Sequence, residues 1–226
     1  MTDYSKIRIA LDGPSGAGKS TIAKKIAEKI GLVYVDTGAL YRSVGLYSIE
    51  NGIDSEDTAG IIASLEKINI RLAYEDGCQK VYLNGSEVGN RIRTPQASKY
   101  ASAVSKIPEV RAFLLKLQRD IAASGGVIMD GRDIGTVVLP NADVKIFLTA
   151  SVEERARRRY KELCEKGIPA ELSVIEEEIR QRDEQDMNRP IAPLKQAEDA
   201  VLLDTSAMNI EESIEALLAI VASKLS

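Results

Sequence analysis

The sequence predicts an α/β fold in which a parallel sheet is flanked by helices, with a small antiparallel β insert and a helical lid. Three observations predict it. Short apolar runs alternate with segments of helical periodicity along the 226 residues, which is typical of a parallel sheet. A glycine-rich turn at residues 13–18 joins the first apolar run to the first helical segment. Between residues 68 and 91 apolar side chains alternate with polar ones, which indicates antiparallel strands.

The glycine-rich turn carries the pattern G-x-x-x-x-G-K-S between a strand-like run, residues 7–11, and a helical segment, residues 21–30. In this context backbone N–H groups and the helix N-terminus bind phosphate, whereas the alternative is a turn that only joins strand to helix. Lys19 is expected to reach the β and γ phosphates of ATP as a catalytic residue, and the Ser20 hydroxyl to ligate Mg²⁺. The expected ATP-binding residues are Gly13, Pro14, Ser15, Gly16, Ala17, Gly18, Lys19, Ser20 and Thr21.

Composition excludes several classes of protein. The chain has no histidine, which excludes histidine acid–base catalysis and histidine metal ligands, but phosphoryl transfer depends mainly on positioning and charge. The net charge of −4 disfavours a nucleic-acid partner, and no run approaches the ~20 apolar residues of a membrane span. The apolar run at residues 7–11 is too short for the core of a signal peptide. Cys78 and Cys164 are predicted to be reduced, partly buried thiols of a cytoplasmic protein.

Local signals place the remaining elements. A second strand at residues 32–35 leads to a helix from residue 39, where Arg42 is a candidate phosphate anchor or a solvated arginine. A polar-faced helix is expected at residues 55–66. The insert, residues 68–91, has strands at 68–74 and 80–83, a hairpin turn at Asn84-Gly85 and a return strand from 87. Thr94 is expected to cap a helix that Pro95 begins, and Pro108 to begin the next.

A charged segment follows the apolar run at residues 127–129. Asp130, Arg132 and Asp133 stand within four residues, and their alternative interpretation is a simple surface ion pair. In the functional interpretation Asp130 holds Mg²⁺ through water, Arg132 binds phosphate and Asp133 contacts a base. Strands at residues 144–148 and 201–203 complete the sheet, and Asn209 is expected to cap the last helix.

Two arginine-rich helices between residues 151 and 190 meet at Gly167 and form the expected lid. Such helices are usually only solvated, but a mobile flap with arginines would also exclude water from a phosphoryl transfer. Ser173 and Glu176 are expected to form a capping box for the second helix. The apolar stripe expected on the first helix comprises Val152, Ala156, Tyr160, Leu163 and Cys164.

Five segments together resemble those of bacterial cytidylate kinases. The resemblance runs from residue 7 to the C-terminal helix and includes the insert, which distinguishes this family from shorter nucleoside monophosphate kinases. The Asp-Gly-Arg-Asp-Ile-Gly-Thr segment is far more specific than the glycine loop. The segments are residues 13–20, 36–42, 93–95, 130–136 and 182–189. The resemblance implies a single P-loop kinase domain, residues 1–226, with a nucleoside monophosphate-binding region at 37–107 and a lid at 151–190.

The resemblance also implies an activity, which is transfer of the ATP γ-phosphoryl group to CMP or dCMP with Mg²⁺, in pyrimidine nucleotide metabolism. It implies a cytoplasmic monomer without nucleic-acid or membrane partners. Many relatives have serine where this chain has Thr37, and the hydroxyl is kept. The implied residues are Thr37, Arg42 and Arg132 at the CMP phosphate with Arg189 nearby, Ser102, Arg111 and Asp133 at cytosine, Arg182 and Asp186 at ribose, and Arg157 and Arg158 at the transferring phosphoryl. The spacing of these last arginines varies across the family, so the choice among Arg155, Arg157, Arg158 and Arg159 stays open.

Three other functions compete with this one. A GTPase would need a guanine-reading N-K-x-D segment, which the sequence lacks. A P-loop kinase of another nucleoside monophosphate or small molecule stays open. So does a non-catalytic ATP-binding regulator, although a sensor has no need for an arginine-rich flap that excludes water.

Overall fold

The computed structural model describes residues 4–75, 78–165 and 167–225. The chain divides into two compact units. The first unit contains Met1–Tyr34 and Gly125–Ser226, and the second contains Val35–Ser124. Each unit has its own hydrophobic core.

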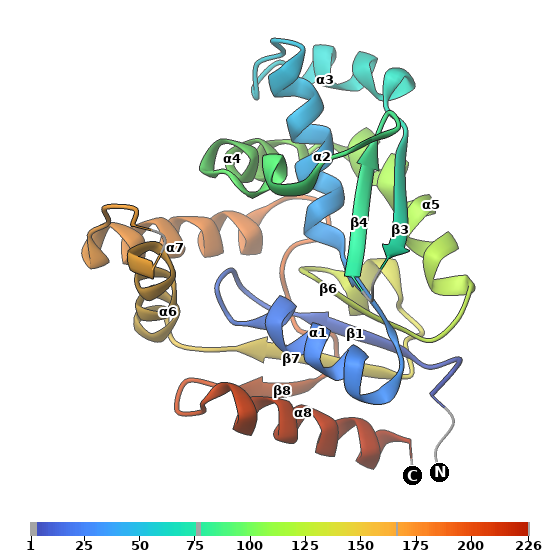
Figure 1. Ribbon diagram of the computed structural model, residues 1–226, viewed down its shortest axis with the longest axis vertical. Coiled ribbons are helices and arrows are strands. Elements are labelled where there is room, and N and C mark those ends of the chain that lie inside the picture. Colours follow the sequence, from blue (N-terminus) through green and yellow to red (C-terminus); the bar gives the residue numbers. More distant parts are fainter. Residues whose placement is uncertain (1–3, 76–77, 166, 226) are drawn as a thin grey trace. The chain divides into compact units, whose positions relative to one another are not determined.

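A five-stranded sheet in the order β2-β6-β1-β7-β8 organises the first unit (Figure 1). The central strand β1 pairs in parallel with β6 and with β7, and β7 pairs in parallel with β8. The predicted parallel sheet is thus confirmed. The strands are β1 (Arg8–Asp12), β2 (Val33–Asp36), β6 (Val127–Gly131), β7 (Val144–Thr149) and β8 (Val201–Asp204).

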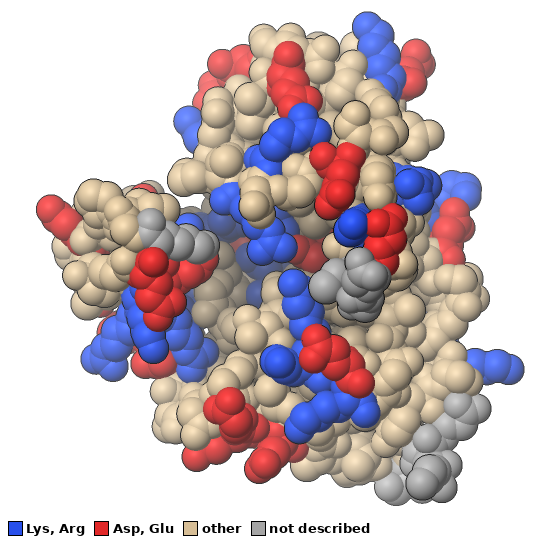
Figure 2. Space-filling view, viewed as in Figure 1, with Lys and Arg blue, Asp and Glu red and all other residues tan. Residues whose placement is uncertain are grey.

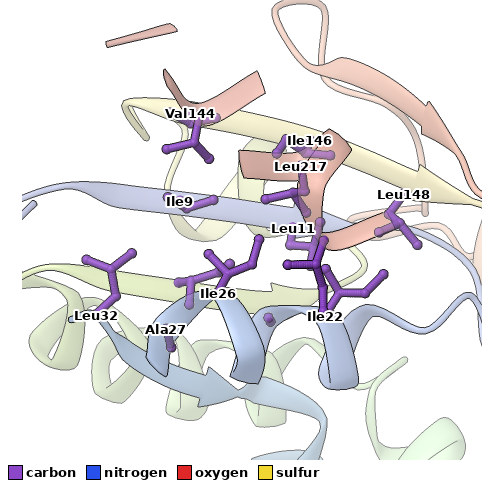
Figure 3. Packing of buried hydrophobic residues seen from close by; sticks show 14 of the residues in the cluster. Ile9, Leu11, Ile22, Ile26, Ala27, Leu32, Val144, Ile146, Leu148 and Leu217 are labelled. Carbon is purple, nitrogen blue, oxygen red and sulfur yellow. The ribbon is translucent and has the colours of Figure 1, made fainter. Parts of the chain in front are cut away.

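Helices α1 and α8 pack against this sheet in one core cluster. Figure 3 shows Ile9 and Leu11 of β1 beside Ile22 and Ile26 of α1, and Leu217 of α8 belongs to the same cluster. Gly31, with a φ of 73°, ends α1, and Asn209 with Glu212 forms a capping box for α8, as Asn209 was predicted to do. The helices of this unit are α1 (Lys19–Ile30), α6 (Val152–Glu165), α7 (Leu172–Asn188), α8 (Ile210–Lys224) and a π-helical turn, η3 (Ile134–Val138).

The second unit joins helices to the predicted antiparallel sheet. Asn84 and Gly85 have φ values of 49° and 83°, which a hairpin turn of the primed type requires. Thr94 accepts a hydrogen bond from the Ala97 N–H and caps α4, as predicted. The elements are α2 (Thr37–Glu50), α3 (Thr58–Ser64), η1 (Leu65–Lys67), β3 (Ile70–Glu75), β4 (Cys78–Leu83), β5 (Ser86–Glu87), η2 (Gly89–Arg93), α4 (Pro95–Val104) and α5 (Pro108–Ala123).

Two local predictions were wrong, and a third was right about the helix but not about its length. Helix α7 begins at Leu172 after Glu171, whose side chain makes no cap, so Ser173 lies inside the helix and forms no capping box with Glu176. Tyr160 and Cys164 are exposed, because α6 and α7 bury only a narrow strip around Ala156, and the predicted apolar stripe is narrower. The side chain of Cys78 lies outside the described residues. The helix predicted at residues 55–66 is only seven residues long and continues as the 3₁₀ turn η1.

Candidate active site

The glycine loop between β1 and α1 can be built only from glycine at its turning points. Gly13, Gly16 and Gly18 have φ values of 149°, 75° and 91°. A Cβ atom on Gly13 would collide with the backbone carbonyl of Leu148 on β7. The missing side chains therefore let the loop approach the end of the sheet and turn into the N-terminus of α1.

Lys19 lies buried at the start of α1 and is held by the loop itself. Its ammonium group donates hydrogen bonds to the carbonyl oxygens of Gly13, at 2.8 Å, and Pro14, at 2.7 Å. Burial and the nearby Arg132 guanidinium lower the pKa of Lys19 to about 7, although the carboxylates of Asp130 and Asp12 act against this. The loop carbonyls therefore hold this lysine in place although burial disfavours its charge.

Ser20 and Asp130 come together, as their predicted roles require. The Ser20 hydroxyl donates a hydrogen bond to Oδ2 of Asp130 at 2.7 Å, and the buried Tyr34 hydroxyl donates to Oδ1 at 3.1 Å. A hydroxyl beside a carboxylate supplies the oxygen ligands that Mg²⁺ prefers, so the residues present fit this ion. Within the described part of the chain, no group of three or more Asp, Glu, His or Cys side chains could hold a metal by itself.

The charged residues that follow β6 form ion pairs with the C-terminal end of α7. Arg132 lies 2.8 Å from Asp186 on α7, and Arg189 lies 3.5 Å from Asp133. Burial raises the pKa of Asp186, but the guanidinium groups of Arg132, Arg182 and Arg189 outweigh it and hold the pKa below its usual range. Asp130 and Asp133 are buried, so the interpretation as a surface ion pair within this segment was wrong.

The lid arginines differ sharply in their surroundings. Arg155 is buried, ion-paired with Asp183 at 2.7 Å, and donates hydrogen bonds to the carbonyl oxygens of Ala150 and Ser15. Arg158 donates to the carbonyl of Thr205 at 2.8 Å. By contrast, the side chain of Arg157 is 69% exposed, and its guanidinium makes only a long ion pair, with 3.8 Å to a carboxylate oxygen of Glu154. Figure 2 shows basic and acidic side chains interspersed over α6 and α7.

In the second unit, Thr37 and Arg42 sit at the start of α2. Asp36 caps this helix by accepting from the Ala39 N–H at 2.9 Å, and its other oxygen lies 2.6 Å from an Arg42 nitrogen. The Nε atom of Arg42 is buried and has no hydrogen-bond acceptor among the residues that the structure describes. Thr37 itself is buried as the first residue of α2.

Ser102 and Arg111 lie on α4 and α5 of the same unit. Arg111 is buried, donates a hydrogen bond to the Ser105 carbonyl at 3.3 Å, and lies over the Tyr41 ring with 5.7 Å between guanidinium carbon and ring centroid. At this distance the ring attracts the guanidinium charge by a cation–π interaction. Ser102 is half-buried.

Comparison with known proteins assigns the family. A family model described as cytidylate kinase matches residues 9–223. The chain belongs to the cytidylate kinase family. It is accordingly an enzyme, a kinase that transfers a phosphoryl group.

Two curated relatives named cytidylate kinase are each 51% identical to the chain. The protein from Carboxydothermus hydrogenoformans aligns over 96% of this chain and 98% of its own, and that from Caldicellulosiruptor bescii over 94% of each. Among solved structures, shikimate kinase from Bacteroides thetaiotaomicron matches with a TM-score of 0.50 and 14% identity, over 96% of this chain and 98% of its own. This likeness concerns the fold, which is that of the P-loop kinases.

Within this cytidylate kinase fold, the sequence predicted no role for three residues that shape the site, and it gave Arg155 only as one of four candidate arginines for the transferring phosphoryl group. Tyr34 holds Asp130, Asp12 accepts two backbone N–H groups of η3, and Arg155 and Asp183 join the lid to the glycine loop. Their partners lie far away in sequence. Only Asp12 gives a signal in the sequence, because it is a charged residue directly after an apolar run that is expected to be a buried strand.

Proposed function

We propose that the chain transfers the γ-phosphoryl group of ATP to CMP or dCMP and yields ADP with CDP or dCDP. The observation that carries the proposal is the similarity, over nearly the whole chain, to curated proteins named cytidylate kinase. The glycine loop beside the buried Lys19 supports ATP as the phosphoryl donor. An oxygen of the CMP phosphate forms a bond to the γ phosphorus, while the bond to the oxygen that bridges β and γ breaks.

The loop residues perform the donor half of this reaction. The backbone N–H groups of the glycine loop, residues 13–20 without Pro14, and the N-terminus of α1 bind the phosphates, and Lys19 exchanges its carbonyl acceptors for β- and γ-phosphate oxygens. Its charged form stabilises the charge that builds up on the leaving ADP. Ser20 and Asp130 would hold Mg²⁺, which neutralises phosphate charge when bound.

The acceptor half of the reaction requires arginines, because a planar guanidinium binds phosphate through two hydrogen bonds. We assign Arg132 and Arg189 to the CMP phosphate, with Thr37 and Arg42 of the second unit. Asp133, Ser102 and Arg111 contact cytosine, and Arg182 and Asp186 contact ribose. The Arg132–Asp186 ion pair supports this assignment, since it holds the group proposed for the phosphate beside the group proposed for the ribose.

The lid excludes water, so that ATP is not hydrolysed when the acceptor is absent. We assign Arg157 and Arg158 to the transferring phosphoryl group. The exposure of Arg157 supports this role, because an exposed guanidinium with only a long ion pair, to Glu154, can turn toward a phosphate. The protein acts as a monomer in the cytoplasm in this proposal. Among the described residues, no helix has the length and apolar character needed to cross a membrane.

A coupled assay of ADP formation tests the proposal. ATP and Mg²⁺ are supplied with CMP, dCMP, UMP, AMP or GMP, with Lys19→Ala as the inactive control and a reaction without acceptor as the hydrolysis control. CMP and dCMP should give the highest kcat/KM. A higher value for another acceptor would identify a different monophosphate kinase. ATP binding without turnover on any acceptor would identify a regulator.

A further inference from the structure

A buried carboxylate at the end of β1 has no part in the chemistry assigned above. Asp12 is 4% exposed and ends the strand that lies between β6 and β7. Burying a carboxylate is costly unless hydrogen bonds compensate. Its presence at the end of the central strand therefore needs a physical explanation.

Both oxygens of Asp12 are used by one short turn. Oδ1 accepts a hydrogen bond from the Ile134 N–H and Oδ2 from the Gly135 N–H, each at 2.7 Å. These are short, charge-assisted bonds, and they reach across 122 and 123 positions of sequence. They satisfy two of the N–H groups that the first turn of a helix leaves without partners.

Asp12 thereby performs a task that normally falls to the residue before the helix. Asp133 occupies the N-cap position of η3, but its side chain makes no cap hydrogen bond. An aspartate at this position would ordinarily cap its own helix. With Asp12 as the cap, the carboxylate of Asp133 is directed to other partners, such as Arg189.

The turn is also packed from its other side. A Cβ atom on Gly135 would stand 3.4 Å from Oδ2 of Asp12 and 3.2 Å from the Lys145 Cδ atom on β7. The ammonium group of Lys145 is held by the Pro140 carbonyl at 2.6 Å and by Asp199 at 2.9 Å. The start of η3 is therefore enclosed between a carboxylate and the stem of a lysine.

We propose that Asp12 is a positioning residue that fixes the start of η3 and thereby sets where Arg132 and Asp133 present their side chains to the acceptor nucleotide. The proposal rests on the acceptor roles proposed above. Misplacement of a binding group by about 1 Å can lower a rate by a factor of about 10². The carboxylate thus acts on the acceptor without touching it.

Titration of Asp12 gives the proposal a distinctive signature. Burial raises the pKa of Asp12 to about 6, with Asp133 acting in the same direction and the two N–H groups and Lys19 opposing it. Because this pKa lies above the ordinary value of 3.8, ionised Asp12 costs stability at neutral pH, and the fold gains stability as pH falls through 6. Protonation of Asp12 near pH 5 should therefore disturb positioning without itself lowering the stability of the fold.

The decisive variant is Asp12→Asn, which keeps the shape but offers one acceptor and one amide donor. We expect kcat/KM for CMP at pH 8 to fall by a factor of about 10 to 100, while the melting temperature is unchanged or higher. The CMP phosphate itself titrates near pH 6. To remove this common effect, kcat/KM of the wild-type enzyme is divided by kcat/KM of the variant at each pH. This ratio should fall toward one at pH 5, because a protonated carboxyl also has one good acceptor.

Asp143→Asn is the matched control, since Asp143 also accepts a backbone N–H, that of Arg8, at 2.8 Å, but at the opposite end of β1. It should keep wild-type activity. A ratio near one at pH 8, or a pH-independent loss that follows a lower melting temperature, would overturn the proposal. If Asp12→Asn does not fold, Gly135→Ala tests the proposal instead, because its Cβ atom would crowd the same turn. The same ratio of kcat/KM and the melting temperature are then measured. A wild-type enzyme inactive on CMP would instead refute the proposed function, and the ratio would be measured on the acceptor that the panel identifies.

Discussion

Arg155→Met should be among the most destabilising single changes in the lid. The side chains of Arg155 and Asp183 are 4% and 11% exposed, and their charged atoms are 2.7 Å apart. Oδ1 of Asp183 is buried without a hydrogen-bond donor in the part of the chain that the structure describes. Removal of the guanidinium leaves this carboxylate buried without a counter-charge, and the carbonyls of Ala150 and Ser15 lose their donor.

The magnitude follows from these losses. Removing one partner of a buried ion pair costs about 3–5 kcal/mol. For a chain of this size each kcal/mol lowers the melting temperature by about 2–4 °C, so we expect a decrease of about 6–20 °C. Circular dichroism measures the melting temperature, and hydrogen exchange of α7 shows whether the loss is local.

Two controls separate the buried ion pair from general damage to the lid. Arg157→Met removes an exposed arginine from the same helix and should change stability by less than about 0.5 kcal/mol. Arg155→Met combined with Asp183→Leu should recover part of the loss, since no carboxylate is then stranded. A double variant less stable than Arg155→Met, or a single variant within about 1 kcal/mol of wild type, would refute the reasoning.

Four further predictions concern the site. Lys19→Ala should lower kcat by a factor of about 10²–10³; since the lowered pKa of Lys19 makes its charge costly in full below about pH 7 and less so toward the ordinary value of 10.5, the melting temperature of the variant relative to wild type should be higher at pH 6 than at pH 9. Arg132→Ala should weaken CMP binding more than ATP binding in calorimetry, and equal losses would contradict its acceptor role. Asp133→Asn should reduce the preference for CMP over UMP in kcat/KM, which we expect to be about 10- to 150-fold if one charged hydrogen bond reads the cytosine amine. Residues 153–189 should exchange amide hydrogens more slowly with both nucleotides bound, and equal protection would indicate a static lid.

Local chemistry made most elements predictable. The turn at Asn84-Gly85, the caps at Thr94 and Asn209 and the glycine loop each depend on a few adjacent residues, and all are confirmed. The capping box at Ser173 was predicted from the same kind of signal and was wrong. There the first buried side chain of the helix is Ile175, and the helix begins at Leu172, before the serine.

The support of the site could not be predicted in this way. Nothing beside Asp12 or Arg155 in the sequence points to Gly135 or Asp183, because those partners become neighbours only when β1 and β6 pair and when α6 and α7 pack. The predicted contacts of Ser102 and Asp133 with cytosine remain predictions, since they concern a ligand.

The strand order has a consequence for how the chain folds. The central strands β1 and β6 pair although the whole second unit lies between them in sequence. Closing so long a loop of disordered chain is entropically unfavourable and slow. The second unit consists of nearby helices and hairpins with its own core, so we expect it to collapse first and to shorten the effective distance between the two strands. The glycine loop, which follows β1, then gains its final form only in the last step, when β1 and β6 pair. A chain arrested before that step would have much of its helix content but no affinity for ATP.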